Sequence, residues 1–237
     1  MAKVIDNIRI DETYFLLKTD LKMDVLPGQF FMLRAWEDYP TLSRPISIYD
    51  ATETLEFLYE VVGEGTEIIS KLKPGDEIKV EGPYGNSFEA EGISEVSLVG
   101  GGVGTAPFNY LSKVLKEKNP DVKIDFYVGE RENQEIEKAF ESLKEIGVNL
   151  IVKKGGLITE VLEYDKKLIY TCGPDIMMKN VTKLGLEKGC EVYVSLDKRM
   201  GCGVGACLSC SCKTTGGNKR SCKDGPVFKG ADIVEYK

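Results

Sequence analysis

The hydrophobic pattern of this chain changes near residue 95, and this change constrains the fold more than any other feature. Before it, short runs rich in β-branched and aromatic residues are separated by turn signals such as Pro27-Gly28 and Pro74-Gly75. Several short strands at this spacing are typical of a small antiparallel barrel, which we expect over residues 1–94.

After residue 95, apolar runs of strand length alternate with segments of helical periodicity. This alternation indicates βαβ units and a parallel sheet, which we expect over residues 95–196. The expected strands are Glu95–Gly100, Val122–Val128, Val148–Val152, Lys167–Thr171 and Val192–Leu196, and the expected helices are Thr105–Lys118, Asn133–Ile146, Leu157–Glu163 and Asp175–Lys188.

The last segment, residues 197–237, follows neither pattern and is rich in Gly, Cys, Lys and Ser. A segment of about 40 residues cannot bury enough apolar surface to be stable alone, so it needs a staple or a host surface. We therefore expect a β barrel plus an α/β domain, followed by a small C-terminal module.

Histidine is missing from the chain, whereas cysteine occurs seven times. The absence of histidine excludes Ser-His-Asp triads, His-ligated zinc, Rieske clusters and His-ligated haem. Any metal held by this chain is expected on sulfur or carboxylate ligands.

The net charge of −7 argues against general nucleic-acid binding. Residues 196–237 nevertheless carry eight basic and only four acidic side chains. Such a basic tail can bind nucleic acid, form a solvated terminus, or offset an anion held nearby.

The amino-terminal segment lacks the long apolar core of a signal peptide, and no run of about 18 apolar residues could span a membrane. We therefore expect a cytoplasmic protein that does not bind membranes. Structural disulfides are rare in the cytoplasm, which favours metal ligation or redox chemistry for clustered cysteines.

Five of the seven cysteines lie between positions 202 and 222. The Cys-x4-Cys-x2-Cys spacing with a fourth, later cysteine follows the plant-type ferredoxin pattern and predicts a [2Fe–2S] cluster. The pattern is met by Cys202, Cys207, Cys210 and Cys222. A four-cysteine zinc site and a disulfide knot are the alternatives, and Cys212 competes as a ligand because spacing alone does not exclude it.

A glycine-rich turn follows the first strand of the α/β region and opens its first helix, which is the context of a nucleotide diphosphate site. Its candidate residues are Gly100, Gly101, Gly102, Gly104 and Thr105. Thr105 occupies the third position of the G-x-G-x-x-G pattern, so a tight turn without a ligand is the alternative. A second candidate is Cys172-Gly173-Pro174, at the strand edge where such sheets bind ligands.

Together, these features resemble the ferredoxin–NADP reductase superfamily, in which a barrel binds flavin and an α/β domain binds a nicotinamide nucleotide. The flavin motif of that family resembles Arg44-Pro45-Ile46-Ser47, with Ile46 in place of the usual aromatic residue, and its second flavin segment resembles Leu58-Tyr59-Glu60 with Gly65-Thr66. The resemblance implies FAD at these residues and NAD at the glycine turn and at Cys172-Gly173-Pro174.

The resemblance also implies roles for individual residues of the flavin site. Arg44 would pair with a phosphate as a planar fork. Ser47 would place a hydroxyl near the reactive edge of the flavin, while Gly65 and Thr66 would contact the diphosphate.

The cysteine-rich string Gly201–Cys207 and the ending Cys222–Phe228 resemble, within this superfamily, the electron-transfer subunits of type B dihydroorotate dehydrogenases. This resemblance implies Cys202, Cys207, Cys210 and Cys222 as cluster ligands. In that family, electrons from dihydroorotate pass through the FMN of a catalytic subunit, then the [2Fe–2S] cluster and FAD, to NAD+ in pyrimidine (UMP) biosynthesis. The implied partner is the FMN-containing catalytic subunit, in a heterotetramer of two plus two.

Hydride transfer to nicotinamide needs no side-chain acid or base, so we expect no catalytic side chain. Two alternatives remain: a subunit of another NAD(P)H-linked reductase, of the ferredoxin, sulfide or sulfite type, and a zinc-stapled binding protein without redox activity. The end of the second α/β strand bears on NAD against NADP. There, an acid of the segment Gly129-Glu130-Arg131-Glu132 could bind a ribose hydroxyl and Arg131 a 2′-phosphate. The alternative is that Glu130, Arg131 and Glu132 lie in a solvated loop.

Overall fold

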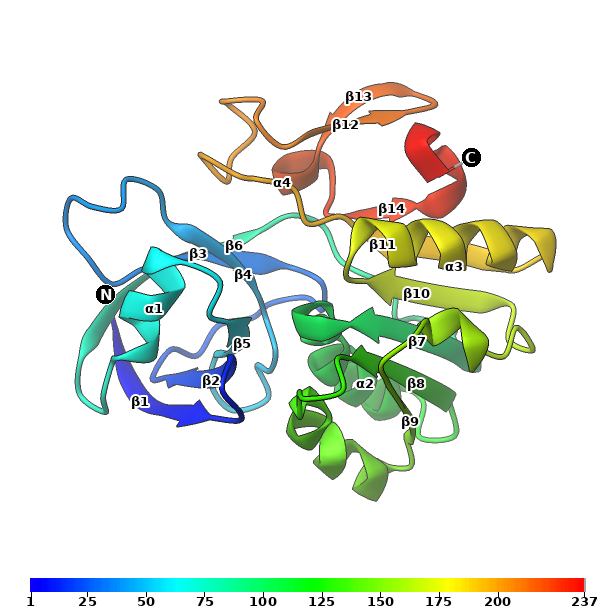
Figure 1. Cartoon of the computed structure of the whole chain (residues 1–237), viewed down its shortest axis with the longest axis horizontal. Coiled ribbons are helices and arrows are strands. Elements are labelled where there is room, and N and C mark those ends of the chain that lie inside the picture. Colours follow the sequence, from blue (N-terminus) through cyan, green and yellow to red (C-terminus); the bar gives the residue numbers. More distant parts are fainter. Residues whose placement is uncertain (237) are drawn as a thin grey trace.

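The computed structural model describes residues 1–236 and contains a barrel, an α/β half and a small C-terminal module that lies over both (Figure 1). The barrel is a six-stranded antiparallel sheet with the order β4-β3-β6-β1-β2-β5. Its edge strands β4 and β5 approach each other, which closes the sheet on itself. The strands are β1 (Ala2–Arg9), β2 (Tyr14–Thr19), β3 (Phe30–Arg34), β4 (Arg44–Ser47), β5 (Glu56–Glu60) and β6 (Glu77–Tyr84).

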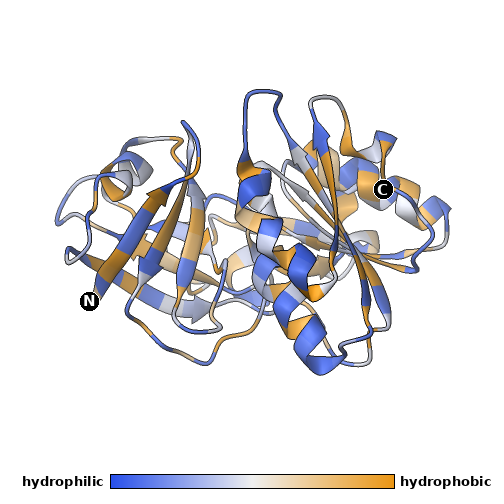
Figure 2. Ribbon diagram, turned by 90° about the horizontal axis from the view of Figure 1, so that it is seen from below, coloured by the Kyte–Doolittle hydropathy of each residue, from blue (hydrophilic) through white to orange (hydrophobic). Residues whose placement is uncertain are grey.

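Hydrophilic and hydrophobic residues alternate along the barrel strands (Figure 2), because successive side chains point to opposite faces. The inward side chains form one apolar core in which Phe31 of β3 meets Phe57 of β5 edge to face, at 5.7 Å between ring centroids. The helix α1 (Glu64–Ser70), which the sequence analysis did not predict, follows β5 and places Ile69 in this core.

The α/β half is built on a second six-stranded sheet with the order β14-β11-β10-β7-β8-β9. Five strands are parallel, as predicted, and the sixth, β14, pairs antiparallel with β11. The parallel strands are β7 (Glu95–Gly101), β8 (Lys123–Glu130), β9 (Asn149–Lys154), β10 (Leu168–Cys172) and β11 (Glu191–Ser195).

The helices of this half are α2 (Pro107–Lys118) and α3 (Asp175–Glu187), joined by the 3-10 segments η1 (Gly102–Thr105), η2 (Ile136–Ile146) and η3 (Ile158–Glu160). The helix expected over 133–146 is therefore a 3-10 segment, and the one expected over 157–163 is reduced to a single 3-10 turn.

The C-terminal module rests on both halves. It contains β12 (Ser211–Thr214), β13 (Gly217–Arg220), α4 (Ser221–Asp224), β14 (Val227–Lys229), η4 (Gly230–Asp232) and η5 (Val234–Tyr236). The side chain of Asn86, just after the barrel, accepts a hydrogen bond from the Val227 amide and donates one to the Val227 carbonyl, both at 2.9 Å. The module thus gains a host surface, as its length predicted. No helix in residues 1–236 is long and apolar enough to cross a membrane.

Candidate functional site

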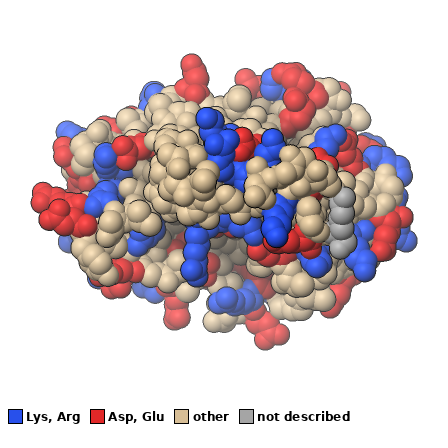
Figure 3. Space-filling model, turned by 90° about the horizontal axis from the view of Figure 1, so that it is seen from above, with Lys and Arg blue, Asp and Glu red and all other residues tan. Residues whose placement is uncertain are grey.

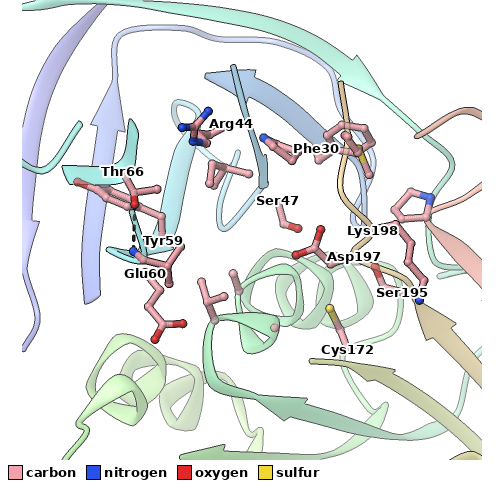
Figure 4. A pocket seen from close by; sticks show the side chains of 18 of the residues that line it. Phe30, Arg44, Ser47, Tyr59, Glu60, Thr66, Cys172, Ser195, Asp197 and Lys198 are labelled. Carbon is pink, nitrogen blue, oxygen red and sulfur yellow. Dashed lines mark hydrogen bonds between the residues drawn. The ribbon is translucent and has the colours of Figure 1, made fainter. Parts of the chain in front are cut away.

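A cavity of about 520 Å³ lies where the barrel, the α/β half and the start of the C-terminal module meet (Figure 4). The barrel contributes two stretches predicted from the sequence, Arg44–Ser47 and Leu58–Glu60, together with Thr66. The α/β half contributes Val103, Gly104, Ala106 and Cys172, and residues 195–200 close the cavity from the module side. The structure therefore brings together nearly all residues that the resemblance assigns to FAD.

Arg44 enters this cavity beside the first turn of α1. A Cβ atom on Gly65 would lie 2.5 Å from the Nε atom of Arg44, so this close approach requires glycine. The guanidinium group stacks on the Trp36 ring at 5.3 Å from its centroid and donates one hydrogen bond to the Leu42 carbonyl. Most of its N–H donors are thus left for an anionic group in the cavity, which fits the diphosphate of a flavin nucleotide.

Thr66 shapes the loop before α1. Its hydroxyl accepts hydrogen bonds from the amides of Val62 and Gly63, at 3.0 and 3.3 Å, and donates to the Gly63 carbonyl at 2.9 Å. The hydroxyl is therefore engaged within the turn, and it is the turn that holds Gly65 against Arg44.

Figure 4 shows Ser47, Asp197 and Cys172 reaching the same cavity from three different elements. Burial raises the pKa of the Cys172 thiol to about 12, and the nearby Asp197 carboxylate adds to this effect. Cys172 is therefore a neutral thiol at physiological pH. Burial and the neighbouring Asp175 raise the pKa of Asp197.

A second cavity, of about 610 Å³, lies along the carboxyl edge of the parallel sheet. The predicted residues Gly101, Gly102, Gly173 and Pro174 line it. Three residues, Glu60, Val103 and Asp197, line both cavities. Ligands in the two cavities would therefore be neighbours.

The other predicted glycine-loop residues lie behind or beside this second cavity. A Cβ atom on Gly100 would lie 2.5 Å from the Cγ2 atom of Thr105, and the Thr105 hydroxyl donates to the Gly102 carbonyl at 2.7 Å. These two residues fix the shape of the loop. Gly104 lines the first cavity, where a Cβ atom would lie 2.5 Å from the Cα atom of Gly173.

The two polar candidates for nucleotide selectivity, Glu130 and Arg131, lie at the end of β8. The side chain of Glu130 is completely buried, and its carboxylate pairs with Lys154 at 3.0 Å. Lys154 also pairs with Glu137 at 2.9 Å. Both residues line the second cavity, Glu130 as a buried side chain paired with Lys154 and Arg131 as an exposed one.

The four predicted cluster ligands form two pairs of thiols. The Sγ atoms of Cys210 and Cys222 are 3.3 Å apart in a buried cluster that also contains Phe30 and Met32 of the barrel. Cys202 accepts hydrogen bonds from the backbone amides of residues 206 and 207, at 3.3 and 3.4 Å.

Cys207, the partner of Cys202, is exposed, and a hydrogen bond with Ser209 lowers its pKa to about 6. Within residues 1–236 no three His, Cys, Asp or Glu side chains form a closed metal site. The donor set is nevertheless four thiols with two backbone N–H groups on one sulfur. This set fits an iron–sulfur cluster, which is held by thiolates and tuned by such hydrogen bonds.

Cys212, left open as a competing ligand, lies in a different environment. It packs with Ile233 and Tyr236 in an apolar cluster that excludes the other module cysteines. Burial raises its pKa, which favours a neutral, structural thiol.

Sequence reasoning missed several residues that line the cavities. Phe30 lines the first cavity and also packs in the cluster that holds Cys210 and Cys222. Tyr14 lines the second cavity because it pairs with Glu60 in the β2–β5 register, which puts both side chains on one face. Only Asp197 carried a signal, since it follows a strand of the parallel sheet at its carboxyl end.

Comparison with known proteins agrees with this architecture. The family described as the iron-sulfur cluster binding domain of dihydroorotate dehydrogenase B matches residues 197–234. The dihydroorotate dehydrogenase B (NAD(+)) electron transfer subunit of Clostridium acetobutylicum is 47% identical, covering 99% of this chain and 96% of the relative. The corresponding subunit of Clostridium perfringens is 41% identical, over 98% and 96%.

Solved structures give the same fold. A structure described as an NADH-dependent reduced ferredoxin-NADP oxidoreductase is 30% identical, with a TM-score of 0.86 over 98% of this chain and 89% of that one. A ferredoxin NADP+ reductase from Neisseria gonorrhoeae, 16% identical, has a TM-score of 0.62 over 79% and 90%. The predicted fold class and the predicted resemblance are both confirmed, and the chain belongs to the family of electron-transfer subunits of dihydroorotate dehydrogenase B.

Proposed function

We propose that this chain carries electrons from the FMN of a catalytic dihydroorotate dehydrogenase subunit, through a [2Fe–2S] cluster and FAD, to NAD+. One observation carries the proposal: the sites follow one another without a gap. Phe30 lines the first cavity and packs in the cluster that holds the buried thiol pair, and Glu60, Val103 and Asp197 line both the first cavity and the second.

Each cofactor is assigned to one part of the chain. FAD would occupy the first cavity, in the barrel domain of residues 1–94, with its diphosphate on Arg44 and the α1 turn. NAD would occupy the second, in the domain of residues 95–196, on the glycine loop and Gly173-Pro174. The cluster would be held by Cys202, Cys207, Cys210 and Cys222, in the module of residues 197–237.

FAD, when bound, supplies the exchange between the one-electron chemistry of a cluster and the two-electron chemistry of nicotinamide. The side chains of this protein would bind and orient FAD. Arg44 fixes the diphosphate end, Ser47 and Cys172 border the opposite end as neutral hydrogen-bonding groups, and Phe30 excludes water between the thiols and the cavity. None of them has to act as a base.

The basic C-terminal module supports a protein partner at the cluster. Val204 and Leu208, close in sequence to the exposed Cys207, are 52% and 59% exposed. Figure 3 shows this side of the molecule, where Lys and Arg side chains gather around uncharged surface. Exposed apolar side chains within a basic rim fit a docking surface for the catalytic subunit, in a heterotetramer of two plus two. All seven cysteines are free, which fits the expected cytoplasmic location.

The test is reconstitution. The purified chain is mixed with an FMN-containing catalytic subunit, and NAD+ reduction by dihydroorotate is measured together with the mass of the complex. Turnover that requires both proteins supports the proposal. Turnover with reduced ferredoxin instead would favour the second candidate, a ferredoxin-linked reductase, which the 30% identical structure supports. A colourless protein containing zinc would refute both.

A further inference from the structure

Tyr14, a residue of the barrel, reaches into the cavity of the α/β half. Its side chain is only 1% exposed, and its ring belongs to the apolar core that joins the two halves and also contains Leu58 of the barrel and Ala106 of the α/β half. Its hydroxyl lies at the start of the glycine loop, because a Cβ atom on Gly102 would be 3.2 Å from the Tyr14 Oη atom. Gly102 itself has a φ of +53° and lines the second cavity.

The Tyr14 hydroxyl borders the cavity as an unused donor. Tyr14 lines the second cavity, and no hydrogen bond joins its hydroxyl to another of the described residues. By contrast, the equally buried Tyr170 of the same core donates its hydroxyl to the Glu89 carbonyl at 3.0 Å. A buried polar group without a protein partner needs one from water or from a ligand.

The surroundings keep this hydroxyl protonated. Burial and the nearby Glu60 carboxylate raise the pKa of Tyr14. Glu60 is its direct partner in the β2–β5 register. At physiological pH the group is therefore a neutral hydrogen-bond donor, held rigid by its packed ring and aimed at the glycine loop.

We propose that the Tyr14 hydroxyl donates a hydrogen bond to the diphosphate of the dinucleotide held on the glycine loop. The inference rests on the proposed function, since it assumes that the second cavity binds a dinucleotide. The diphosphate is the acceptor because a glycine turn at the start of a helix places phosphate oxygens beside Gly102. The barrel and the α/β half would then hold the same ligand from opposite sides.

The matched pair of variants for testing this inference is Tyr14→Phe and Tyr170→Phe. Each removes one hydroxyl from a tyrosine of the same core, and only the first faces the cavity. Binding of ADP, ADP-ribose and NADH to the FAD- and cluster-loaded protein is measured by titration calorimetry, and thermal unfolding confirms that both variants fold.

Tyr14→Phe is expected to weaken ADP and ADP-ribose binding by the same factor of about ten, as for the loss of one hydrogen bond to a charged group. Tyr170→Phe is expected to bind both like the wild type. Unchanged ADP binding by Tyr14→Phe would overturn the inference, and so would a loss confined to ADP-ribose, which would place the hydroxyl at the ribose. Failure of the wild-type protein to bind ADP-ribose and NADH would instead overturn the proposed function.

Discussion

Replacing Gly65 by alanine should weaken FAD binding in the first cavity without lowering the free energy of unfolding. The new Cβ atom would lie 2.5 Å from Nε and 2.6 Å from Cζ of Arg44. Ordinary contact needs about 3.5 Å, so the guanidinium group has to move by about 1 Å. Arg44 is a flexible, partly exposed side chain, and it can move without disturbing the barrel core.

The expected effects on binding and on stability therefore diverge. A hydrogen bond to a charged group contributes about 1.5–3 kcal/mol, so misplacing Arg44 should weaken FAD binding by about ten- to a hundred-fold. The free energy of unfolding of the FAD-free protein should not fall, because alanine favours the helix α1 over glycine by about 1 kcal/mol.

The control for this experiment lies two residues away. A Cβ atom on Gly63 would meet no atom within 4 Å, and its backbone is extended, so Gly63→Ala should bind FAD like the wild type. FAD is removed, and the apoprotein is titrated while flavin fluorescence is followed; unfolding is followed by circular dichroism. Our reasoning is refuted if Gly65→Ala binds FAD as tightly as the wild type, or if both variants lose binding equally.

Three further predictions concern other parts of the chain. Cys210→Ser should abolish the visible absorption and the reduced-state EPR signal of the cluster, whereas Cys212→Ala should keep both; the reverse would show that the wrong cysteine is assigned. Gly104→Ala should lower both FAD and NADH affinity at least ten-fold, since its Cβ atom would meet backbone at 2.5 Å; normal affinities would show that the loop can shift. Burial raises the pKa of Asp11, but hydrogen bonds that include one from the Glu135 amide of the other half outweigh this and lower it. Asp11→Asn should therefore cost roughly 1 kcal/mol of stability near pH 7. This cost should begin to shrink as the pH falls below about 4, where the carboxyl of the unfolded chain takes up its proton, and should be lost below the lowered pKa of the folded protein; a constant difference in unfolding midpoint across that range would contradict this.

The sequence predicted those parts of the fold that repeat a pattern over enough residues. Each of the five strands from β7 to β11 begins and ends within two residues of its predicted bounds. Helix α1 was missed because its seven residues are too few to establish a helical period. Strand β14, of three residues, gave no period either, and its antiparallel pairing with β11 depends on where the module docks.

The candidate site was predictable where one short motif carries the chemistry. Arg44–Ser47 and the cysteine spacing are motifs of this kind. Tyr14 and Phe30 were missed because nothing in the local sequence distinguishes them from other barrel aromatics; their positions follow from strand register and from the packing of the module. Glu130, the last residue of β8, lines the second cavity, but nothing in the sequence indicated that Lys154, in the neighbouring strand β9, pairs with its carboxylate.

The antiparallel pairing of β14 with β11 has a kinetic consequence. Val227, in β14, pairs with Ser195 of the sheet and is also bonded to Asn86 at the end of the barrel. The C-terminal module is thereby anchored to both halves and is not a mobile domain on a flexible linker. Electron transfer between cluster and flavin would then need no diffusive search by a mobile domain, and its rate should be insensitive to the viscosity of the solvent.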